Sequence, residues 1–210
     1  RPQRLISYHR LNSKANSSLL SSLTTSMKSA VEMPGSTLAG KSVTVVVELQ
    51  ARFDEESNIY WANKLQEEGV KVIFGITDLK IHCKLCLISR KEHGEVRYYA
   101  NIGTGNYNEN TAKLYTDFSL FTSDPDITQE VRDMFDFLNN IYQVKKYHEL
   151  LVSPFYLRKE LTKLINREAQ NAKAGKPAEI MMKLNNLVDP IVIKSLYRAN
   201  KAGVKIRLIV

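Results

Sequence analysis

A histidine and a lysine stand two residues apart in an otherwise largely apolar run, residues 79–89. The run is typical of a β-strand, in which side chains two residues apart point to the same side, so His82 and Lys84 are expected side by side. A neutral imidazole is a nucleophile toward phosphorus, and a neighbouring ammonium can stabilise the negative charge of phosphoryl oxygens during transfer. The pair therefore indicates phosphoryl-transfer chemistry. The alternative is an edge strand whose outer face is solvated.

A glycine-rich loop, residues 103–108, follows one hairpin after the histidine. Glycines allow backbone N–H groups to approach an anion closely, and hydroxyl and amide side chains add further donors. An ordinary turn can have the same composition, so the position of the loop after His82 is what indicates a phosphate site. The candidate residues of this loop are Gly103, Thr104, Gly105, Asn106 and Asn108.

The strands and helices that must carry these residues follow from hydrophobic periodicity. A strand at 43–49, a helix at 54–68 and a strand at 70–74 form a βαβ unit, which implies a parallel strand pair with a right-handed crossover. Arg52 follows the first of these strands, at the carboxyl end where α/β sheets bind ligands. An ion pair with the acidic residues that come next is the alternative interpretation of Arg52.

The next predicted elements are antiparallel. Strands at 79–89 and 96–102, joined by the polar turn between them, are expected to form a hairpin, and a further strand covers 115–121. A helix is expected to begin at Asp126, which has Gln129 three residues later, as in a capping box. The sequence therefore predicts that the histidine and the glycine loop lie on neighbouring strands.

The order strand, aspartate, helix and Gly-Val-Lys recurs near the carboxyl terminus. Asp54 and Asp189 are 135 residues apart, and Gly69 and Gly203 are 134 apart. Ahead of the second copy, a helix is expected to begin at Ser153. The recurrence predicts a duplicated domain that is complete once and then begins again. We expect three segments: a Ser/Thr-rich, atypical lead-in at 1–42, a first domain at 43–150 and the start of a second at 151–210.

The 210 residues carry a net charge of +8, with 30 basic and 22 acidic residues. Residues 1–42 hold 6 basic residues and 1 acidic residue, so a polyanion site in the remainder has to be local. No apolar run is long enough to span a membrane, and no secretion signal opens the chain. Two cysteines, Cys83 and Cys86, are too few for a disulfide scaffold or a four-ligand metal site, which fits a protein of the reducing cytoplasm.

Residues 45–56, 79–85 and 102–108, together with 114–117, resemble the polyphosphate kinases of the phosphohistidine type. The resemblance extends from about residue 40 to Val210, whereas residues 11–39 do not match the family's pattern. It implies an α/β fold of the phospholipase D type, in which a domain with a mixed sheet is followed by a second, related domain.

Each candidate residue takes a role from this resemblance. His82 matches the histidine that attacks the γ-phosphate of ATP and becomes phosphohistidine, with Lys84 beside it, and Tyr115 matches a tyrosine that contacts the nucleotide. Arg52 matches an arginine of the magnesium and phosphate site, but a guanidinium has no lone pair for a metal, so we expect it to bind phosphate beside the ion. Arg10 lies in a faint match to the strand that carries a second such arginine. The family's phosphate-binding loop corresponds to Gly103, Thr104, Gly105 and Asn106.

The resemblance implies a transferase that reversibly moves the terminal phosphate of ATP to polyphosphate, with Mg²⁺ as the cofactor that neutralises the triphosphate. The expected partners are ATP or ADP and inorganic polyphosphate, not nucleic acid. The whole protein is expected to be a homo-oligomer in the cytoplasm, either free or associated with the membrane. We expect the chain to be a fragment that lacks a second half-site and has little or no turnover alone.

Two other functions are consistent with parts of the sequence. A phospholipase D-like phosphodiesterase would also form phosphohistidine, but its motif would carry aspartate seven residues after the histidine, where this chain has Ser89. The second alternative is a non-catalytic module that binds polyanions through its charge and its loop.

Overall fold

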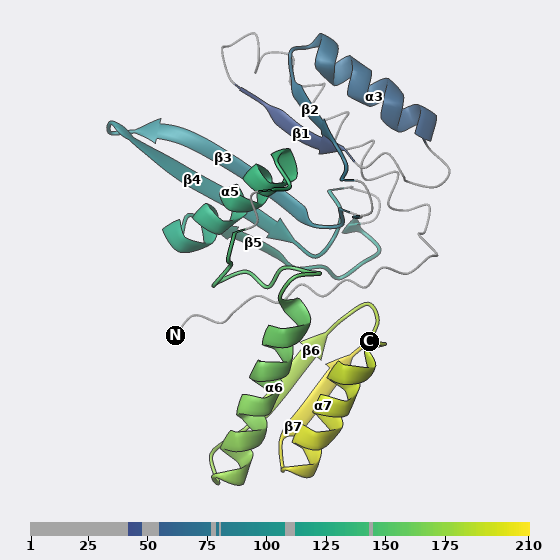
Figure 1. The fold of residues 1–210 in the computed structure, drawn as a ribbon, viewed down its shortest axis with the longest axis vertical. Helices are drawn as coiled ribbons and strands as arrows, with labels where there is room; N and C mark the ends of the chain where they lie inside the picture. Colours follow the sequence, from purple (N-terminus) through teal and green to yellow (C-terminus); the bar gives the residue numbers. More distant parts are fainter. Residues whose placement is uncertain (1–41, 48–54, 77–78, 80, 108–111, 143–144) are drawn as a thin grey trace. The chain divides into compact units, whose positions relative to one another are not determined.

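The computed structural model of the chain describes residues 42–47, 55–76, 79, 81–107, 112–142 and 145–210. They fall into two compact units, one reaching Lys146 and the other beginning at Tyr147, and each unit combines helices with β-strands (Figure 1). The α/β fold class expected from the sequence is confirmed. Among the described residues, no helix has the length and apolar character needed to cross a membrane.

The first unit opens with the predicted parallel βαβ arrangement. β1 (Thr44–Val47) pairs in parallel with β2 (Lys71–Phe74), and α3 (Glu55–Glu67) lies between them in the chain. Val47, Leu65 and Val70 form the buried core that helix and strands share. The boundaries follow the hydrophobic runs of the sequence because burial of those runs holds this unit together.

A three-stranded antiparallel sheet follows, in the order β3 (Lys84–Glu92), β4 (Glu95–Gly103) and β5 (Ser119–Thr122). It is separate from the β1–β2 pair in the described residues. The predicted turn at 90–95 is too long, because the β3–β4 ladder continues to Glu92 and reverses at His93 and Gly94. These two residues have φ angles of 50° and 89°, as a tight hairpin turn requires.

Two strands begin later than predicted. β3 starts at Lys84 rather than at residue 79, and β5 starts at Ser119 rather than at Tyr115. Both limits have one cause: β4 ends at Gly103, which pairs with Lys84 on one side and with Ser119 on the other. Beyond that glycine the chain leaves the sheet, so β4 offers no partner to the earlier residues. His82 and Tyr115 therefore precede their strands.

The helix after the sheet is capped differently from the prediction. α5 (Pro125–Asn139) has Asp124 as its N-cap, whose carboxylate accepts from the amides of Asp126 at 3.0 Å and Ile127 at 3.1 Å. The predicted capping box of Asp126 and Gln129 is wrong, because Pro125 already starts the helix. α5 contacts β3 and β4, and Lys71 Nζ donates to Asn139 Oδ1 at 2.7 Å, which connects α5 to β2.

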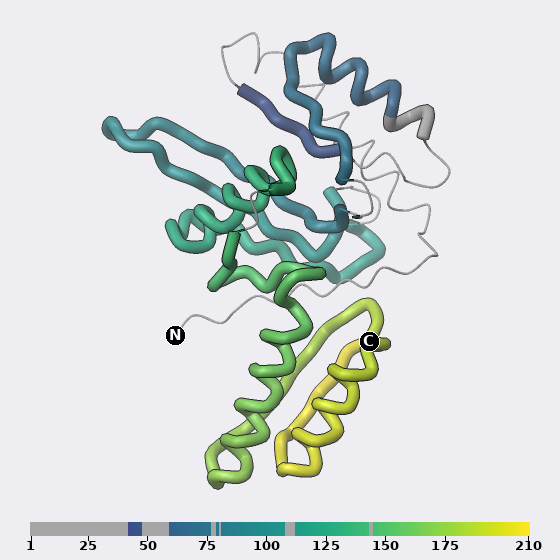
Figure 2. Tube along the Cα trace, viewed as in Figure 1, coloured from purple at the N-terminus to yellow at the C-terminus, as the bar shows by residue number. Residues whose placement is uncertain are grey.

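The second unit is a helix followed by another parallel βαβ arrangement. Its elements are α6 (Leu157–Lys173), β6 (Glu179–Lys183), α7 (Pro190–Lys201) and β7 (Lys205–Ile209). Helices α6 and α7 pack against each other and against the two strands, as the Cα trace shows (Figure 2). The buried core consists of Leu161, Ile165, Val192, Leu196, Ala199 and Val204.

The two helices of this unit start in different ways. The helix expected after Asp189 is α7, and the carboxylate of Asp189 caps it, accepting from the amides of Ile191 at 2.9 Å and Val192 at 3.1 Å. α6 begins at Leu157 rather than at Ser153, because a turn precedes it. In that turn the amide of Leu157, like that of Tyr156, donates to the carbonyl of Val152.

The repeat seen in the sequence is present in the backbone. After α3, the amide of Val70 donates to the carbonyl of Leu65 at 3.0 Å. After α7, the amide of Val204 donates to the carbonyl of Ala199 at 3.1 Å. The residue before each valine is a glycine with positive φ, 76° and 98°, the conformation that ends a helix and that glycine adopts without strain. Both βαβ units thus turn from helix to strand through the same hydrogen bonds, as the recurrence predicted.

Candidate active site

His82 and Lys84 lie in direct contact at the start of β3. Lys84 Nζ is 2.8 Å from His82 Nδ1 and 3.2 Å from Nε2, and it donates to the carbonyl oxygen of His82 at 2.7 Å. An ammonium can only donate, so an imidazole nitrogen that receives its hydrogen bond is unprotonated. The predicted proximity is confirmed, although His82 precedes the strand and the lysine side chain folds back toward it.

Lys84 is also the residue that connects the histidine to the glycine loop. It is buried, with 8% of its surface exposed, and it pairs with Gly103 across β3 and β4. A Cβ at position 103 would lie 3.6 Å from Lys84 Cβ and 3.3 Å from the carbonyl oxygen of Gly105. The loop therefore begins at the backbone position opposite the lysine, as expected for one site built from neighbouring strands.

Thr104 fixes the near end of the loop to the segment that enters β5. Its amide donates to the carbonyl of Phe118 at 3.0 Å, and the amide of Phe118 donates to Thr104 Oγ1 at 2.9 Å. The hydroxyl of Thr104 donates to Asp117 Oδ1 at 3.0 Å. The single hydroxyl proton is engaged within the protein, so this arrangement makes Thr104 an anchor of the loop rather than a donor toward a ligand.

Asp117 explains the glycine at position 105. A Cβ on Gly105 would lie 2.1 Å from Asp117 Oδ2 and 2.4 Å from its Cγ, distances that no real contact of a Cβ allows. The carboxylate occupies the space that any side chain at 105 would need. Gly105 is thus required for close packing of the loop against the segment before β5.

The far end of the loop is attached through a tyrosine. The hydroxyl of Tyr107 donates to Asn101 Oδ1 at 2.7 Å, and Asn101 Nδ2 donates to Ser119 Oγ at 2.7 Å. Burial, with smaller contributions from Cys86 and Cys83, raises the pKa of Tyr107, so its hydroxyl keeps the proton that it donates. These bonds connect the loop, β4 and the start of β5.

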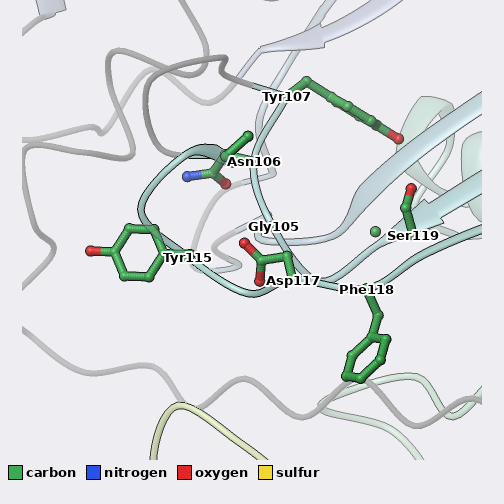
Figure 3. A pocket seen from close by; sticks show the side chains of 9 residues that line it. Gly105, Asn106, Tyr107, Tyr115, Asp117, Phe118 and Ser119 are labelled. Carbon is green, nitrogen blue, oxygen red and sulfur yellow. The ribbon is translucent and has the colours of Figure 1, made fainter.

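A recess of about 250 Å³ lies along the loop. Tyr115, with 55% of its surface exposed, borders it from the segment before β5. In Figure 3 the side chain of Tyr107 points toward Ser119, away from Tyr115. Within the described residues, the backbone amides of Gly105 and Asn106 have no hydrogen-bond partner, so they remain available as donors. The residues that line the recess are Gly103, Gly105, Asn106, Tyr107, Ala112, Tyr115, Asp117, Phe118 and Ser119.

The structure brings together most of the residues singled out in the sequence. His82, Lys84 and the loop meet at the ends of β3 and β4, and Tyr115 shares the recess with the loop. Arg10 and Arg52 lie outside the described residues, as does Asn108. Among the residues that are described, no group of three or more His, Cys, Asp or Glu side chains is arranged to hold a metal ion.

Three residues of the site were not identified from the sequence: Asn101, Tyr107 and Asp117. Asn101 is a polar residue near the end of the predicted strand 96–102, and this was a signal that it needs hydrogen-bond partners if it is buried. Asp117 stood within the segment 114–117 that carried the family resemblance. Nothing in the spacing of the sequence indicated that its carboxylate would pack on Gly105.

Comparison with known proteins gives matches along most of the chain. The family model for polyphosphate kinase C-terminal domain 1 matches residues 16–144, and the model for C-terminal domain 2 matches residues 150–210. The first range includes much of the stretch 11–39, in which the sequence alone gave no resemblance. Over 171 residues, 81% of this chain, the sequence is 57% identical to the polyphosphate kinase of Escherichia coli strain K12 and 55% identical to that of Vibrio parahaemolyticus.

The crystal structure of polyphosphate kinase from Porphyromonas gingivalis is also similar, with a TM-score of 0.74 and 36% sequence identity. That match covers 87% of this chain and 30% of the solved chain. For the Escherichia coli and Vibrio parahaemolyticus relatives, the aligned part amounts to 25% of the length of each protein. The chain thus spans about a quarter of the length of these relatives.

Proposed function

This chain belongs to the polyphosphate kinase family, and we propose that it supplies one half of a site at which the whole protein moves the terminal phosphate of ATP to polyphosphate. The observation that carries the proposal is the contact of 2.8 Å between Lys84 Nζ and His82 Nδ1. Lys84 in turn pairs with Gly103, the first residue of the glycine loop. The names of the relatives favour this reaction over cleavage of a phosphodiester.

In the proposed reaction, a nitrogen of His82 attacks the γ-phosphorus of ATP. The N–P bond forms as the bond to the β,γ-bridging oxygen breaks, and that oxygen leaves with ADP. The terminal oxygen of polyphosphate then attacks the phosphohistidine, which lengthens the polymer by one phosphate and restores the imidazole. The unprotonated ring nitrogen implied by the lysine contact supports this role, since a protonated imidazole has no lone pair to give.

Lys84 would supply positive charge where the transferred group becomes most negative. The Lys84 ammonium contacts both ring nitrogens of His82, so it has to move away from the nitrogen that attacks. It can then donate hydrogen bonds to the phosphoryl oxygens of the transferred group. Its burial supports a strong effect, because a charge screened from water acts more strongly on a neighbouring anion.

The loop would hold the phosphates of the nucleotide. The amides of Gly105 and Asn106 support this role, since they lack partners within the described residues and border the recess. Tyr115, exposed at the edge of the recess, is suited to contact the nucleotide base. Arg52 and Arg10 remain our candidates for phosphate binding from outside the described residues.

The residues present are compatible with Mg²⁺ bound mainly through phosphate. This ion typically takes one or two carboxylates together with substrate phosphates and water, and Asp117 is the carboxylate among the residues that line the recess. When bound, the ion neutralises charge on the triphosphate. The contribution of the chain itself would be to place Asp117 beside the loop.

The test compares two histidine variants of the whole protein. His82→Ala should abolish ATP-dependent synthesis of polyphosphate, because it removes the nitrogen that attacks the γ-phosphorus. His93→Ala is the matched control, since His93 lies exposed in the β3–β4 turn. Retention of more than a tenth of the activity by His82→Ala, with the protein folded, would refute the proposed role.

A further inference from the structure

We propose that Asn101 is a positioning residue that holds the glycine loop in its anion-binding shape, acting through the hydroxyl of Tyr107. The inference rests on the proposed function, since it assigns a residue to the same phosphate-binding loop. Asn101 would not touch substrate itself.

Asn101 is a buried polar residue. It lies in the middle strand β4, paired with Cys86 of β3 and Phe121 of β5, and only 7% of its surface is exposed. An amide side chain at such a position is costly unless its oxygen and nitrogen both have partners. A valine or threonine would suit a central strand better. The presence of asparagine therefore calls for a role that an apolar residue cannot fill.

The two hydrogen-bond partners of the Asn101 side chain lie at the end of the loop and at the start of β5. Oδ1 of Asn101 accepts from Tyr107, the last described residue of the loop, and Nδ2 donates to Ser119, the first residue of β5. Both distances are 2.7 Å, which is the usual length for the O–H···O bond and at the short end for the N–H···O bond. One buried side chain thus fastens the end of the loop to two strands.

The loop is attached to the rest of the unit on both sides of its anion-binding amides. Thr104 holds the near end of the loop through Phe118 and Asp117, and Tyr107 holds the far end through Asn101. Gly105 and Asn106, whose amides lack partners in the described residues, lie between these two anchors. A loop attached at both ends keeps its donors oriented before the anion arrives, which lowers the entropy lost on binding.

The proposal predicts a specific kinetic signature. Loss of the Tyr107 hydroxyl frees one end of the loop without altering His82 or Lys84, so binding of ATP should weaken more than the chemical step. We expect Tyr107→Phe to raise the KM for ATP by about five- to tenfold, the usual worth of one hydrogen bond, and to change kcat by less than twofold. A defect of folding would instead lower the active fraction, and with it kcat at unchanged KM.

The experiment uses the whole protein and a matched tyrosine. Tyr99 lies on β4, the strand that carries Asn101, and its hydroxyl donates to Glu92 near the hairpin turn, away from the loop. Tyr99→Phe removes one hydroxyl of the same kind and should leave KM and kcat unchanged. Ser119→Ala should resemble Tyr107→Phe in part, and Ser119→Thr, which keeps the hydroxyl, should restore the KM.

A double-variant cycle then tests whether Tyr107 acts through Asn101. In an Asn101→Ala protein the tyrosine hydroxyl has lost its acceptor, so adding Tyr107→Phe should raise KM by less than twofold further. Equal KM values for Tyr107→Phe and Tyr99→Phe, or independent effects of the two substitutions in the cycle, would overturn the proposal. If Asn101→Ala does not fold, the proposal is still decided by comparing Tyr107→Phe with Tyr99→Phe and Ser119→Ala with Ser119→Thr.

These outcomes are distinct from failure of the proposed function. That failure would appear in the unsubstituted protein, as a lack of ATP-dependent polyphosphate synthesis. The inference about Asn101 fails only where the unsubstituted protein is active and the loop variants match their controls.

Discussion

Lys84 and Gly103 stand opposite each other across the β3–β4 pair, and this register sets the geometry of the whole site. The lysine side chain reaches back to His82, and the glycine opens the loop toward the recess. Antiparallel pairing fixes the two backbones about 5 Å apart. The candidate nucleophile and the candidate phosphate loop are therefore held together by the sheet itself.

The first prediction concerns the charge of Lys84. Lys84→Met keeps a long side chain of similar shape but removes the ammonium, so the rate of phosphohistidine formation should fall by about 10²–10³. The KM for ATP should change little, because the loop is intact. Single-turnover measurement of the phosphorylated protein gives the rate. Lys84→Arg keeps the charge and should retain part of the rate of phosphohistidine formation. A Lys84→Met protein as fast as the Lys84→Arg protein would contradict the electrostatic role.

The second prediction concerns the packing of Gly105 on Asp117. Gly105→Ala places a Cβ where the carboxylate lies, so the loop or the aspartate has to move, and polyphosphate synthesis should fall at least tenfold. Asp117→Gly removes the obstruction. Adding Gly105→Ala to that variant should cost much less activity than in the unsubstituted protein. Equal losses in both backgrounds would show that the close contact has no bearing on the reaction.

The third prediction concerns the pH dependence of the second unit. Burial alone would raise the pKa of Asp189, but hydrogen bonds from the amides of Val192 and Ile191, with the guanidinium of Arg158, lower it overall. A carboxylate with a lowered folded-state pKa stabilises the fold fully above its unfolded pKa, about 3.9. This stabilisation should be lost as the pH falls below that value, and urea unfolding at pH 7 and pH 3 measures it.

The matched variants for Asp189 separate capping from charge. Asp189→Ala loses the N-cap of α7 and should destabilise the protein by about 1–2 kcal/mol at pH 7. Asp189→Asn keeps an acceptor oxygen but not the charge, so it should be less destabilised and should lose the dependence on acidic pH. An alanine variant as stable as the unsubstituted protein would contradict the capping role.

The sequence predicted the elements that hydrophobic burial determines. The two βαβ units follow from apolar runs such as Val43 to Val47, and the shared helix ends follow from Gly69 and Gly203, so both were predictable. The closeness of His82 and Lys84 was also predicted, but for a different reason. His82 precedes β3, so the two side chains do not meet through the alternation of side chains along a strand; the lysine side chain folds back to the histidine instead.

Features that depend on contacts between distant residues were not predictable. The start of β3 is set by where β4 ends, which local periodicity does not contain. The anchors of the loop pair Thr104 with Phe118 and Tyr107 with Asn101, and these pairs become neighbours only when β5 folds back. The cap of α5 was missed because Asp124 and Asp126 are both acceptable caps, and Pro125 decides between them.

In the proposed reaction, His82 is the residue that accepts the phosphate. The most direct measurement incubates the whole protein with γ-labelled ATP and Mg²⁺, digests it under alkaline conditions that preserve phosphohistidine, and maps the label by mass spectrometry. We expect acid-labile phosphate on His82, discharged by added ADP or polyphosphate. Label on another residue, or undiminished label in the His82→Ala protein, would contradict it.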